Sequence, residues 1–482
     1  MQYSRTLRSG LAISLASALA ACATLPRVDA PAAPVQPVAL GTSKAFEPSQ
    51  ATFPEDAWWT SFGDETLNAL IEEGLRASPD TALAAARIRA ADAMAEQAGG
   101  ALTPSLSVEG AGGGAKQSYN MGIPAQFVPK GIVGTGKLSA AFGFNLDLWG
   151  RNRAALAAAQ SDAAAVRVDG QQARLLLSTS IATAWVEFSQ LWANRDIAAT
   201  AVQVRRETET LTAARVNAGI DNQSDLDLAR SRHAAARSEL AALDEALDLN
   251  RNRIAALVGA GPDRGDQLPR PSFQSSLISG APANLALDLL GRRPDIVAAR
   301  LRTEAAAKRV KVAKRDFYPN INLSAVAGLQ SLGLSNLFDS GSSMANFGPA
   351  ISLPLFDGGL LAGRYRAADA SYSEAVARYD ATLINAFREV ADALDSRRAL
   401  DTRRSSTNEA ASTAEHAASL ARLRYQKGIA NLLQALAADD AALAAQRASA
   451  DLDARAHLLD IALTRALGGG FNASLSKDKA GT

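Results

Sequence analysis

Cysteine is nearly absent from this chain of 482 residues, which contains only Cys22. A single cysteine cannot form an internal disulfide bond. The three histidines, His233, His416 and His457, lie on predicted helices without metal-ligand spacing, and we expect structural or surface roles for them. The sequence contains no Gly-rich phosphate loop, nucleophile elbow or paired-Cys motif. We therefore expect no catalysis, no cofactor and no resident metal.

No sign of charge dominates, because 50 basic residues stand against 49 acidic ones. Nucleic acid is therefore not an expected partner. Aromatic residues make up only 5% of the chain, and alanine is abundant. This composition suits long, closely packed helices better than a thick globular core.

Glycine and proline are both missing from the 64 residues between Arg364 and Lys427. As one helix this stretch would be about 96 Å long, too long for a compact domain, so it must pack against partners along its length. A twin stretch, Arg151–Ala218, is interrupted only by Gly170. Apolar residues recur at helical spacing in both stretches, which predicts two long helices.

Both long helices are expected to end in related sequences, Arg215–Ile220 and Arg424–Ile429, at an offset of 209 residues. The glycine in each sequence, Gly219 or Gly428, is suited to the left-handed conformation that stops a helix. We expect a returning helix after each stop, over about Asn222–Leu257 and Asn431–Leu467.

Further similarities make the chain a tandem repeat. Pro79 and Pro294 stand where helices would begin, and Pro104 and Pro319 follow 25 residues later in each copy, at an offset of 215. Alternating apolar residues after these prolines predict a strand in each copy, and a second strand follows in each. The four predicted strands lie near 105–109, 137–149, 320–324 and 347–355. Pro349 and Pro354 would each remove a ladder hydrogen bond, which predicts an irregular fourth strand.

The amino-terminal 21 residues have the features of an export signal, with Arg5 and Arg8 before an apolar run. The run ends in Leu19-Ala20-Ala21-Cys22, which resembles the bacterial lipobox. We expect a lipoprotein signal peptide over 1–21 and lipidation of Cys22. In lipoproteins of this kind, Ala23 rather than Asp after the cysteine implies sorting to the outer membrane. A Pro/Ala-rich leader or tether then covers 22–55.

Strands of about ten residues with one apolar face fit a transmembrane β-barrel, but a half-buried sheet in a soluble domain shows the same alternation. The export signal and lipobox favour the membrane. Four strands cannot close a barrel, and open strand edges are not tolerated in lipid. Closure therefore requires several chains, with eight strands for a dimer or twelve for a trimer.

Several motifs together resemble those of the TolC/OprM outer-membrane efflux proteins, and the lipobox places the chain nearest the NodT-type lipoprotein branch. The similarity covers about Trp58 to Gly469. The motifs are R-P-D at Arg293, F-Y-P-N at Phe317, L-P-L-F-D-G-G at Leu353 and R-Y-x-x-G at Arg424.

The resemblance implies an α+β membrane protein with two tandem repeats, each a strand pair plus long helices. Three chains would form a twelve-stranded outer-membrane barrel that continues into a periplasmic α-helical barrel. The implied partners are a homotrimer, a periplasmic adaptor and an inner-membrane pump of the RND type. We expect repeat 1 over 56–260, a linker over 261–284, repeat 2 over 285–469 and a tail over 470–482.

In this family, polar and ionic contacts at the helix turns constrict the tunnel tip. Carried onto this sequence, Arg424, Tyr425 and Gly428 match the second tip. Gln434 and Ala437 stand where better-known members carry an Asp pair.

Acidic residues remain near the first tip at Asp221, Asp225 and Asp227, and Asp439 and Asp440 lie further along the other helix. We hypothesise that Asp225 and Tyr425 contribute to the gate, with Asp221 and Arg424 beside them. Solvated charges and a packed tyrosine would explain the same residues.

The two tip turns are also the expected adaptor-docking surface, because glycine lets another backbone approach closely. The predicted docking residues are Arg215, Gly219, Arg424 and Gly428, although a helix stop explains the glycines equally well. The function we predict is a passive exit duct for efflux in a Gram-negative outer membrane, lipid-anchored and spanning the periplasm. The alternatives are an exit duct for secreted polypeptide and a periplasmic coiled-coil scaffold lipoprotein.

Overall fold

The structure, a computed structural model, describes residues 26, 32–36, 52–120, 122–273 and 285–473. The expected signal peptide, Cys22 and most of the leader therefore lie outside the described residues. The chain divides into two compact units. The strand unit comprises residues 88–166 and 299–379 with residues up to Pro34, and the helical unit comprises 35–87, 167–298 and 380–482. Each unit thus combines segments from both sequence repeats.

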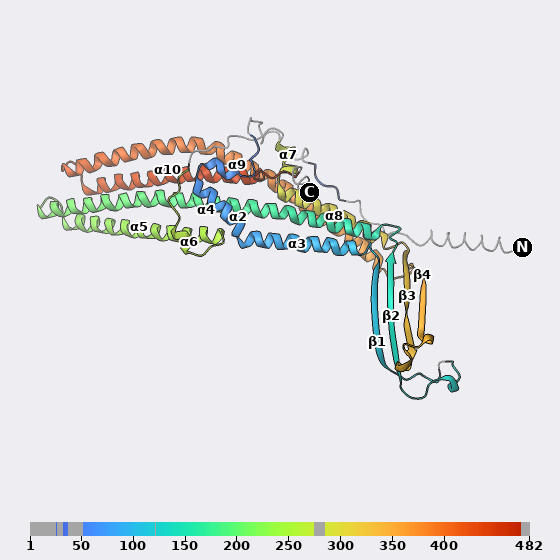
Figure 1. Ribbon diagram of the computed structural model, residues 1–482. Coiled ribbons are helices and arrows are strands. Elements are labelled where there is room, and N and C mark those ends of the chain that lie inside the picture. Colours follow the sequence, from blue (N-terminus) through green and yellow to red (C-terminus); the bar gives the residue numbers. More distant parts are fainter. Residues whose placement is uncertain (1–25, 27–31, 37–51, 121, 274–284, 474–482) are drawn as a thin grey trace. The chain divides into compact units, whose positions relative to one another are not determined.

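The strand unit contains an antiparallel sheet in the order β1-β2-β3-β4, with the four strands side by side (Figure 1). Both hairpins predicted from the alternation are confirmed, although the strands are longer or shifted relative to the predicted ranges. The bounds are β1 Ser105–Ala115, β2 Val133–Asn145, β3 Asn320–Leu332 and β4 Ser343–Ser352.

The register places most of the large apolar residues of the four strands on one face. Leu106 lies opposite Phe142, Phe142 lies opposite Ala325, and Ala325 lies opposite Phe347. Because side chains alternate between the two faces, the other face receives the polar set, including the ion pair between Lys137 and Glu109 at 3.6 Å. Phe347 is 84% exposed within the chain. The apolar face of the sheet is therefore uncovered by the residues that the structure describes.

The two prolines predicted to disturb the fourth strand behave differently. Pro349 lies inside β4, opposite Leu323, whereas Pro354 lies beyond the end of the strand at Ser352. Since β4 is an edge strand of the chain, proline can lie there without breaking a central ladder.

The predicted long helices are confirmed as α4 Arg151–Asn217 and α9 Leu360–Gln426. The second begins earlier than the predicted Arg364, because Asp357 accepts hydrogen bonds from the backbone N–H groups of Gly359 and Leu361 and starts the helix there. The returning helices α5 and α10 are confirmed, as are the helices that begin at Pro79 and Pro294. Their bounds are α5 Gln223–Leu257, α10 Leu432–Ala466, α3 Pro79–Gly100 and α8 Pro294–Arg315.

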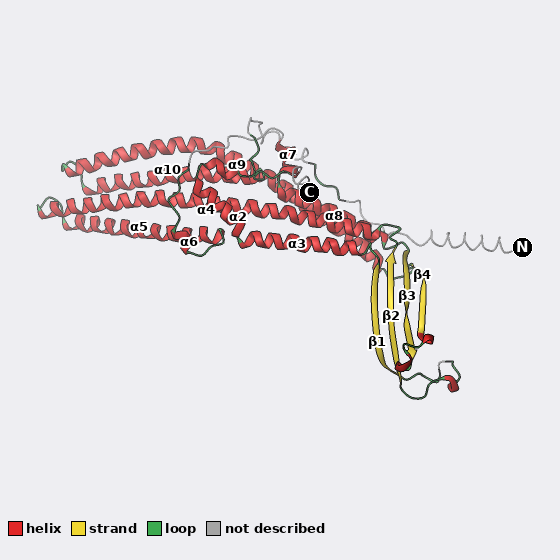
Figure 2. Ribbon diagram, viewed as in Figure 1, coloured by secondary structure: helices red, strands yellow, loops and turns green. Residues whose placement is uncertain are grey.

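Shorter elements complete the described chain: η2 Trp58–Phe62, α2 Glu65–Ala77, η3 Ala125–Phe127, α6 Asp263–Asp266, α7 Leu285–Arg292, η4 Leu334–Asn336 and η5 Ser340–Ser342. In the helical unit, α4, α5, α9 and α10 run side by side (Figure 2). No helix among the described residues has the length and apolar character needed to cross a membrane.

The core of the helical unit forms where η2 and α2 pack against the middle of α4. Trp185 of α4 is fully buried there, beside Trp58, Phe62 and Ile181. Asp64, the N-cap of α2, accepts hydrogen bonds from Trp185 Nε1 at 2.9 Å and from the backbone N–H groups of Leu67 and Ser272 at 3.0 and 3.1 Å. Three donors compensate the burial of this carboxylate, so it fixes the position of α4.

The R-P-D motif has a structural role in the helical unit. The buried guanidinium of Arg293 binds Asp295 at 2.6 Å, Glu389 of α9 at 2.8 Å and the carbonyl of Ala466 at the end of α10 at 3.1 Å. The start of α8 is thereby fastened to α9 and α10 of its repeat.

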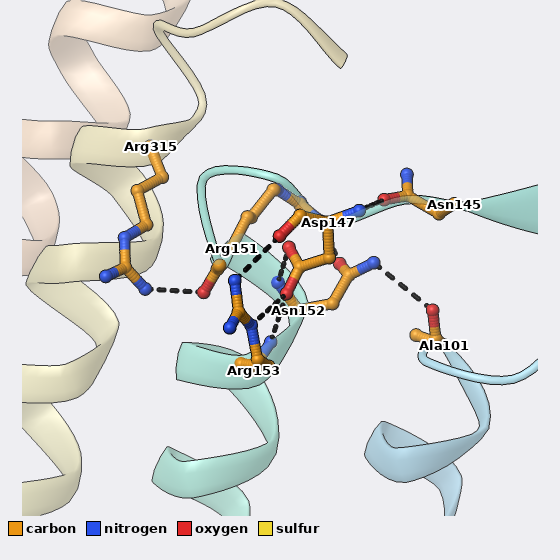
Figure 3. Close-up of polar contacts among 8 residues, drawn as sticks. Ala101, Asn145, Asp147, Arg151, Asn152, Arg153 and Arg315 are labelled. Carbon is orange, nitrogen blue, oxygen red and sulfur yellow. Dashed lines mark hydrogen bonds and ion pairs between the residues drawn. The ribbon is translucent and has the colours of Figure 1, made fainter. Parts of the chain in front are cut away.

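The strand-to-helix turn after β2 depends on Asp147, which adopts a positive φ of 43° (Figure 3). Its carboxylate accepts hydrogen bonds from the backbone N–H groups of Asn152 and Arg153 at 2.8 and 3.0 Å, which satisfies donors at the start of α4. Arg315 at the end of α8 donates to the Gly150 carbonyl in the same turn. Asp147 and Asp357 thus perform the same capping in the two repeats.

Candidate functional site

The candidate site lies in the helical unit, where α4 turns into α5 and α9 turns into α10. Both turns have the same backbone structure. Gly219 and Gly428 have φ values of 73° and 75°, and the next residues, Ile220 and Ile429, donate back to the carbonyls of Arg215 and Arg424 at 2.9 and 2.8 Å. This Schellman motif requires the left-handed conformation that glycine adopts without strain.

Asparagine begins the returning helix after each turn. The Asn222 side chain accepts from the Asp225 backbone N–H at 3.0 Å, and the Asn431 side chain accepts from Gln434 at 2.9 Å. In the first repeat the Asp225 carboxylate also accepts from the Asn222 backbone N–H, which completes a capping box. Asp225 and Gln434 therefore occupy equivalent places at the start of their helices.

A charged and aromatic cluster joins the two turns. The guanidinium of Arg215 binds both carboxylate oxygens of Asp221, at 2.7 and 3.0 Å. It also donates to the Tyr425 carbonyl at 3.3 Å and lies 4.8 Å from the centre of the Tyr425 ring. The Tyr425 hydroxyl donates to Asp221 at 2.8 Å and lies 2.8 Å from the Thr212 hydroxyl. Arg215, Asp221, Tyr425 and Thr212 are called the tip cluster below.

The tip cluster is largely shielded from water. Tyr425 is 2% exposed, and the side chains of Arg215 and Asp221 are each 13% exposed. The hydrogen bond from Arg215 lowers the pKa of Asp221 below its ordinary value of 3.8, although burial acts in the opposite direction. Burial raises the pKa of Tyr425, so its hydroxyl stays protonated and remains a donor.

A second set of ion pairs lies deeper along the same helices. Asp440 of α10 pairs with Arg205 of α4 and with Arg232 of α5, the latter at 3.5 Å. The neighbouring Asp439 is buried and lies 3.2 Å from Arg422 of α9. Burial raises the pKa of Asp439. The helix pair α4/α5 is therefore joined to the pair α9/α10 by the tip cluster, by Asp440 and, further along, by the ion pair of Arg447 with Glu239 and the hydrogen bond from Gln190 to Asp451.

The family follows from comparison with known proteins. The sequence profile described as "Outer membrane efflux protein" matches residues 70–260 and 285–469. The chain belongs to the outer membrane efflux protein family.

Individual relatives agree with this assignment. The fusaric acid resistance protein FusA of Burkholderia cepacia is 32% identical over 377 residues, which cover 75% of this chain and 68% of FusA. The multidrug resistance outer membrane protein MdtP of Escherichia coli is 27% identical, and the match covers 98% of both chains. The crystal structure of the outer membrane protein VceC of Vibrio cholerae superposes with a TM-score of 0.80 at 41% identity, covering 87% of this chain and 100% of VceC.

Membership confirms the predicted architecture and class. This efflux protein is an outer-membrane channel that spans the outer membrane and the periplasm, and it is not an enzyme. Its paired strands and long helices are those of channels built as a β-barrel continued by an α-helical barrel. The family implies a trimer that works with an adaptor and an inner-membrane pump.

The structure brings only some of the predicted site residues together. Arg215, Asp221 and Tyr425 meet in the tip cluster. Asp225 instead caps α5. Arg424 is exposed, and its carbonyl closes the second turn.

Sequence reasoning missed Thr212 and the pairing of Arg215 with Asp221 across the first turn. A signal for that pairing is visible when the two tips are compared. At the offset of 209, Arg424 corresponds to Arg215, but Ala430 stands at the place of Asp221. An acid six residues after the arginine occurs only in the first repeat, so only that arginine is neutralised within its own turn.

The pH dependence of the tip cluster follows from the lowered pKa of Asp221. A carboxyl whose folded-state pKa lies below 3.8 stabilises the tip cluster fully above pH 3.8, and this stabilisation is lost as the pH falls through the lowered value. We expect the single-channel conductance of the reconstituted protein to stay constant between pH 7 and 5 and to rise below pH 3.8. Recordings across this range test it.

Asp221→Asn is the matched control, because it should conduct more at every pH and lose the acid-induced rise. Asp460, which pairs with Arg397, has a pKa raised to about 7 by burial. A conductance change near neutral pH that Asp221→Asn shares would therefore come from a group other than Asp221, and an acid rise that survives in Asp221→Asn would contradict the assignment.

Proposed function

We propose that this protein is the passive exit duct of a tripartite efflux system and that the tip cluster holds its periplasmic end closed. The observation that carries the proposal is the bidentate Arg215–Asp221 pair bound to Tyr425 across two helix pairs. A charge-assisted, shielded contact of this kind has a defined geometry and can be broken by a small displacement of one helix pair.

Opening of the tip does not require a chemical reaction there. Opening needs a partner that binds the open arrangement better than the closed one, because a ligand shifts an equilibrium only through its differential affinity. We infer that the adaptor and the pump provide this difference. The ion pairs of Asp440 with Arg205 and Arg232 lie further from the tip, and they would hold that part of the same helices in place while the tip moves.

The cargo is not defined by the channel. Relatives with similar sequences are named for fusaric acid resistance, multidrug resistance and cation efflux. We infer that the pump, which we expect to be of the RND type, selects the cargo of this system.

Removing one hydroxyl tests the gate. Tyr425→Phe should destabilise the closed arrangement by about 1.5–3 kcal/mol, because a hydrogen bond to a charged group is lost. The open fraction should then increase roughly ten- to hundredfold at 1.4 kcal/mol per tenfold. Single-channel recordings of the purified protein in planar bilayers measure it.

Asp227→Asn is the control for this experiment, since Asp227 is exposed and contacts only Gln223 and Arg230 of its own helix among the described residues. An open fraction that Tyr425→Phe leaves at the wild-type value would rule out the tip cluster as the gate. A wild-type protein without conductance would favour a scaffold instead of a duct.

In this proposal Asp225 stabilises the first turn indirectly, because its carboxylate caps the start of α5. Asp225→Ala should weaken the first turn by about 1 kcal/mol and raise conductance less than Tyr425→Phe does. Unchanged conductance and ion selectivity would remove Asp225 from the gate.

We propose that the two tip turns are also the adaptor-docking surface. Gly219, Gly428 and Arg424 are exposed, and Ile220 and Ile429 beside the glycines are 62% and 68% exposed. The side chain of Arg215 is held in the tip cluster, so it is not available to the adaptor. Arg215 contributes to the docking surface through its backbone carbonyl, which closes the first turn.

Adding side chains at the turns tests docking without unfolding them. Asparagine tolerates the left-handed conformation, so Gly219→Asn with Gly428→Asn keeps the turns and blocks close backbone approach. We expect adaptor affinity to fall about tenfold or more in a binding assay with the detergent-solubilised channel. Arg237→Gln, an exposed residue of α5, should bind like the wild type. Equal affinity of all three proteins would place docking elsewhere.

We further propose that acylated Cys22 anchors the mature chain, on the support of the Leu19–Cys22 motif alone. Membrane-extracted wild type should have the mass of residues 22–482 plus its acyl groups, and Cys22→Ser should lack both cleavage and acylation. Ala23→Asp should keep the acyl mass but accumulate in the inner membrane. An unmodified Cys22 in the wild type, measured by intact mass spectrometry, would refute the anchor.

A further inference from the structure

The last two turns of α8 carry a concentration of positive charge beside the sheet. Within eight residues the helix contains five basic side chains, and β3 begins five residues after its end. The five residues are Lys308, Arg309, Lys311, Lys314 and Arg315. Lys308, Lys311 and Lys314 recur every third residue, so they lie along one face of the helix.

Contacts within the strand unit use three of these five cations. Arg309 pairs with Asp162, Lys308 donates to the Ala157 carbonyl at 3.2 Å, and Arg315 donates to the Gly150 carbonyl (Figure 3). Lys311 and Lys314 are exposed, and neither forms an ion pair within the described residues. These two ammonium groups are therefore available to an anion from outside the chain.

The first repeat shows that the fold does not need these cations. At the offset of 215 residues, α3 has Glu96 at the place of Lys311 and Gly99 at the place of Lys314. Yet α3 spans 22 residues, as α8 does, and also leads into a strand. Favourable interaction of the lysines with the carboxyl end of the helix dipole thus contributes to α8 but is dispensable for the architecture.

Aromatic side chains flank the basic residues where the strands end. Trp149, 47% exposed, stacks on Tyr318 with ring centres 5.3 Å apart and donates to the Pro319 carbonyl at 2.7 Å. Tryptophan and tyrosine favour the headgroup level of a membrane, where their polar atoms meet water and their rings meet lipid. Lys311 lies four residues from the end of α8, which is about 6 Å along the helix axis. This distance is less than the Debye length of about 8 Å, so salt does not fully screen the charge of Lys311 at the end of the helix.

We propose that Lys311 and Lys314 bind the phosphate of anionic phospholipid headgroups at the periplasmic surface of the outer membrane. The proposal rests on the membrane location of β3, which follows from the family, and is independent of the gate. A lysine ammonium binds phosphate as a point charge, and two on one helix face approach the same or adjacent headgroups. The second repeat therefore contacts the membrane surface through charge, and the first does not.

The test uses the full-length purified channel in neutral detergent, with dioctanoyl phosphatidylglycerol as the probe. Native mass spectrometry counts bound lipid, and a thermal melt measures the stabilisation that the lipid gives. Each lysine near a charged lipid surface contributes on the order of 1 kcal/mol. We therefore expect Lys311→Gln with Lys314→Gln to bind phosphatidylglycerol about thirtyfold more weakly.

The matched control is Arg87→Gln with Arg89→Gln, which removes the same charge from exposed residues of α3 far from its strand. It should bind phosphatidylglycerol like the wild type. Dioctanoyl phosphatidylcholine should bind wild type and variant equally, and inorganic phosphate should not compete at equal concentration.

Three results would overturn the proposal: equal binding of phosphatidylglycerol by all proteins, equal preference for both lipids, or saturation by free phosphate. A change of ion selectivity in the lysine variant with unchanged lipid binding would overturn it too, because the two lysines would then line the channel. Wild-type conductance in the lysine variant, together with loss of lipid binding, separates this proposal from the proposed gate.

Discussion

The constraint on which the structure depends is that every backbone N–H and C=O group within lipid must be hydrogen-bonded. The sheet satisfies this only at its inner strands, since β1 and β4 each leave one edge unpaired within the described part of the chain. An apolar face with Phe347 84% exposed likewise has no covering element among the described residues of its own unit. When several chains close a barrel, the open strand edges are paired and the apolar face meets lipid. Assembly therefore follows from the need to hydrogen-bond the backbone within the membrane.

The two repeats share their architecture, and the proposed gate and lipid site lie where they differ. Both tips have the same Schellman turn, but only the first has an acid, Asp221, to pair with its arginine. Both short helices lead into strands, but only α8 carries the lysines that α3 replaces with Glu96 and Gly99. Features present in only one copy are therefore candidates for functions that this copy alone performs.

Local chemistry made much of the fold predictable. The alternation of apolar and polar residues predicts both hairpins, and the scarcity of glycine and proline predicts α4 and α9. The glycines at the tips predict where these two helices end. The predicted helix boundaries are less accurate where a side chain caps the helix. Asp357 does so at α9, which therefore begins before Gly363. The candidate site was only partly predictable. Closeness to the turn favours Asp225, but its carboxylate caps α5, whereas Asp221 reaches across to the other helix pair.

The sequence by itself determined the repeat, the element types, the polarity of the strands and the family, because each depends on neighbours within a few residues or on motifs at fixed offsets. The tertiary structure alone decided which side chains meet. Thr212 and Tyr425 are separated by 213 residues, and their hydroxyls lie 2.8 Å apart only because the end of α4 meets the end of α9 at the tip. A contact of that kind depends on the rotation of each helix about its axis, and that rotation is set by packing along the whole helix rather than by the residues in contact.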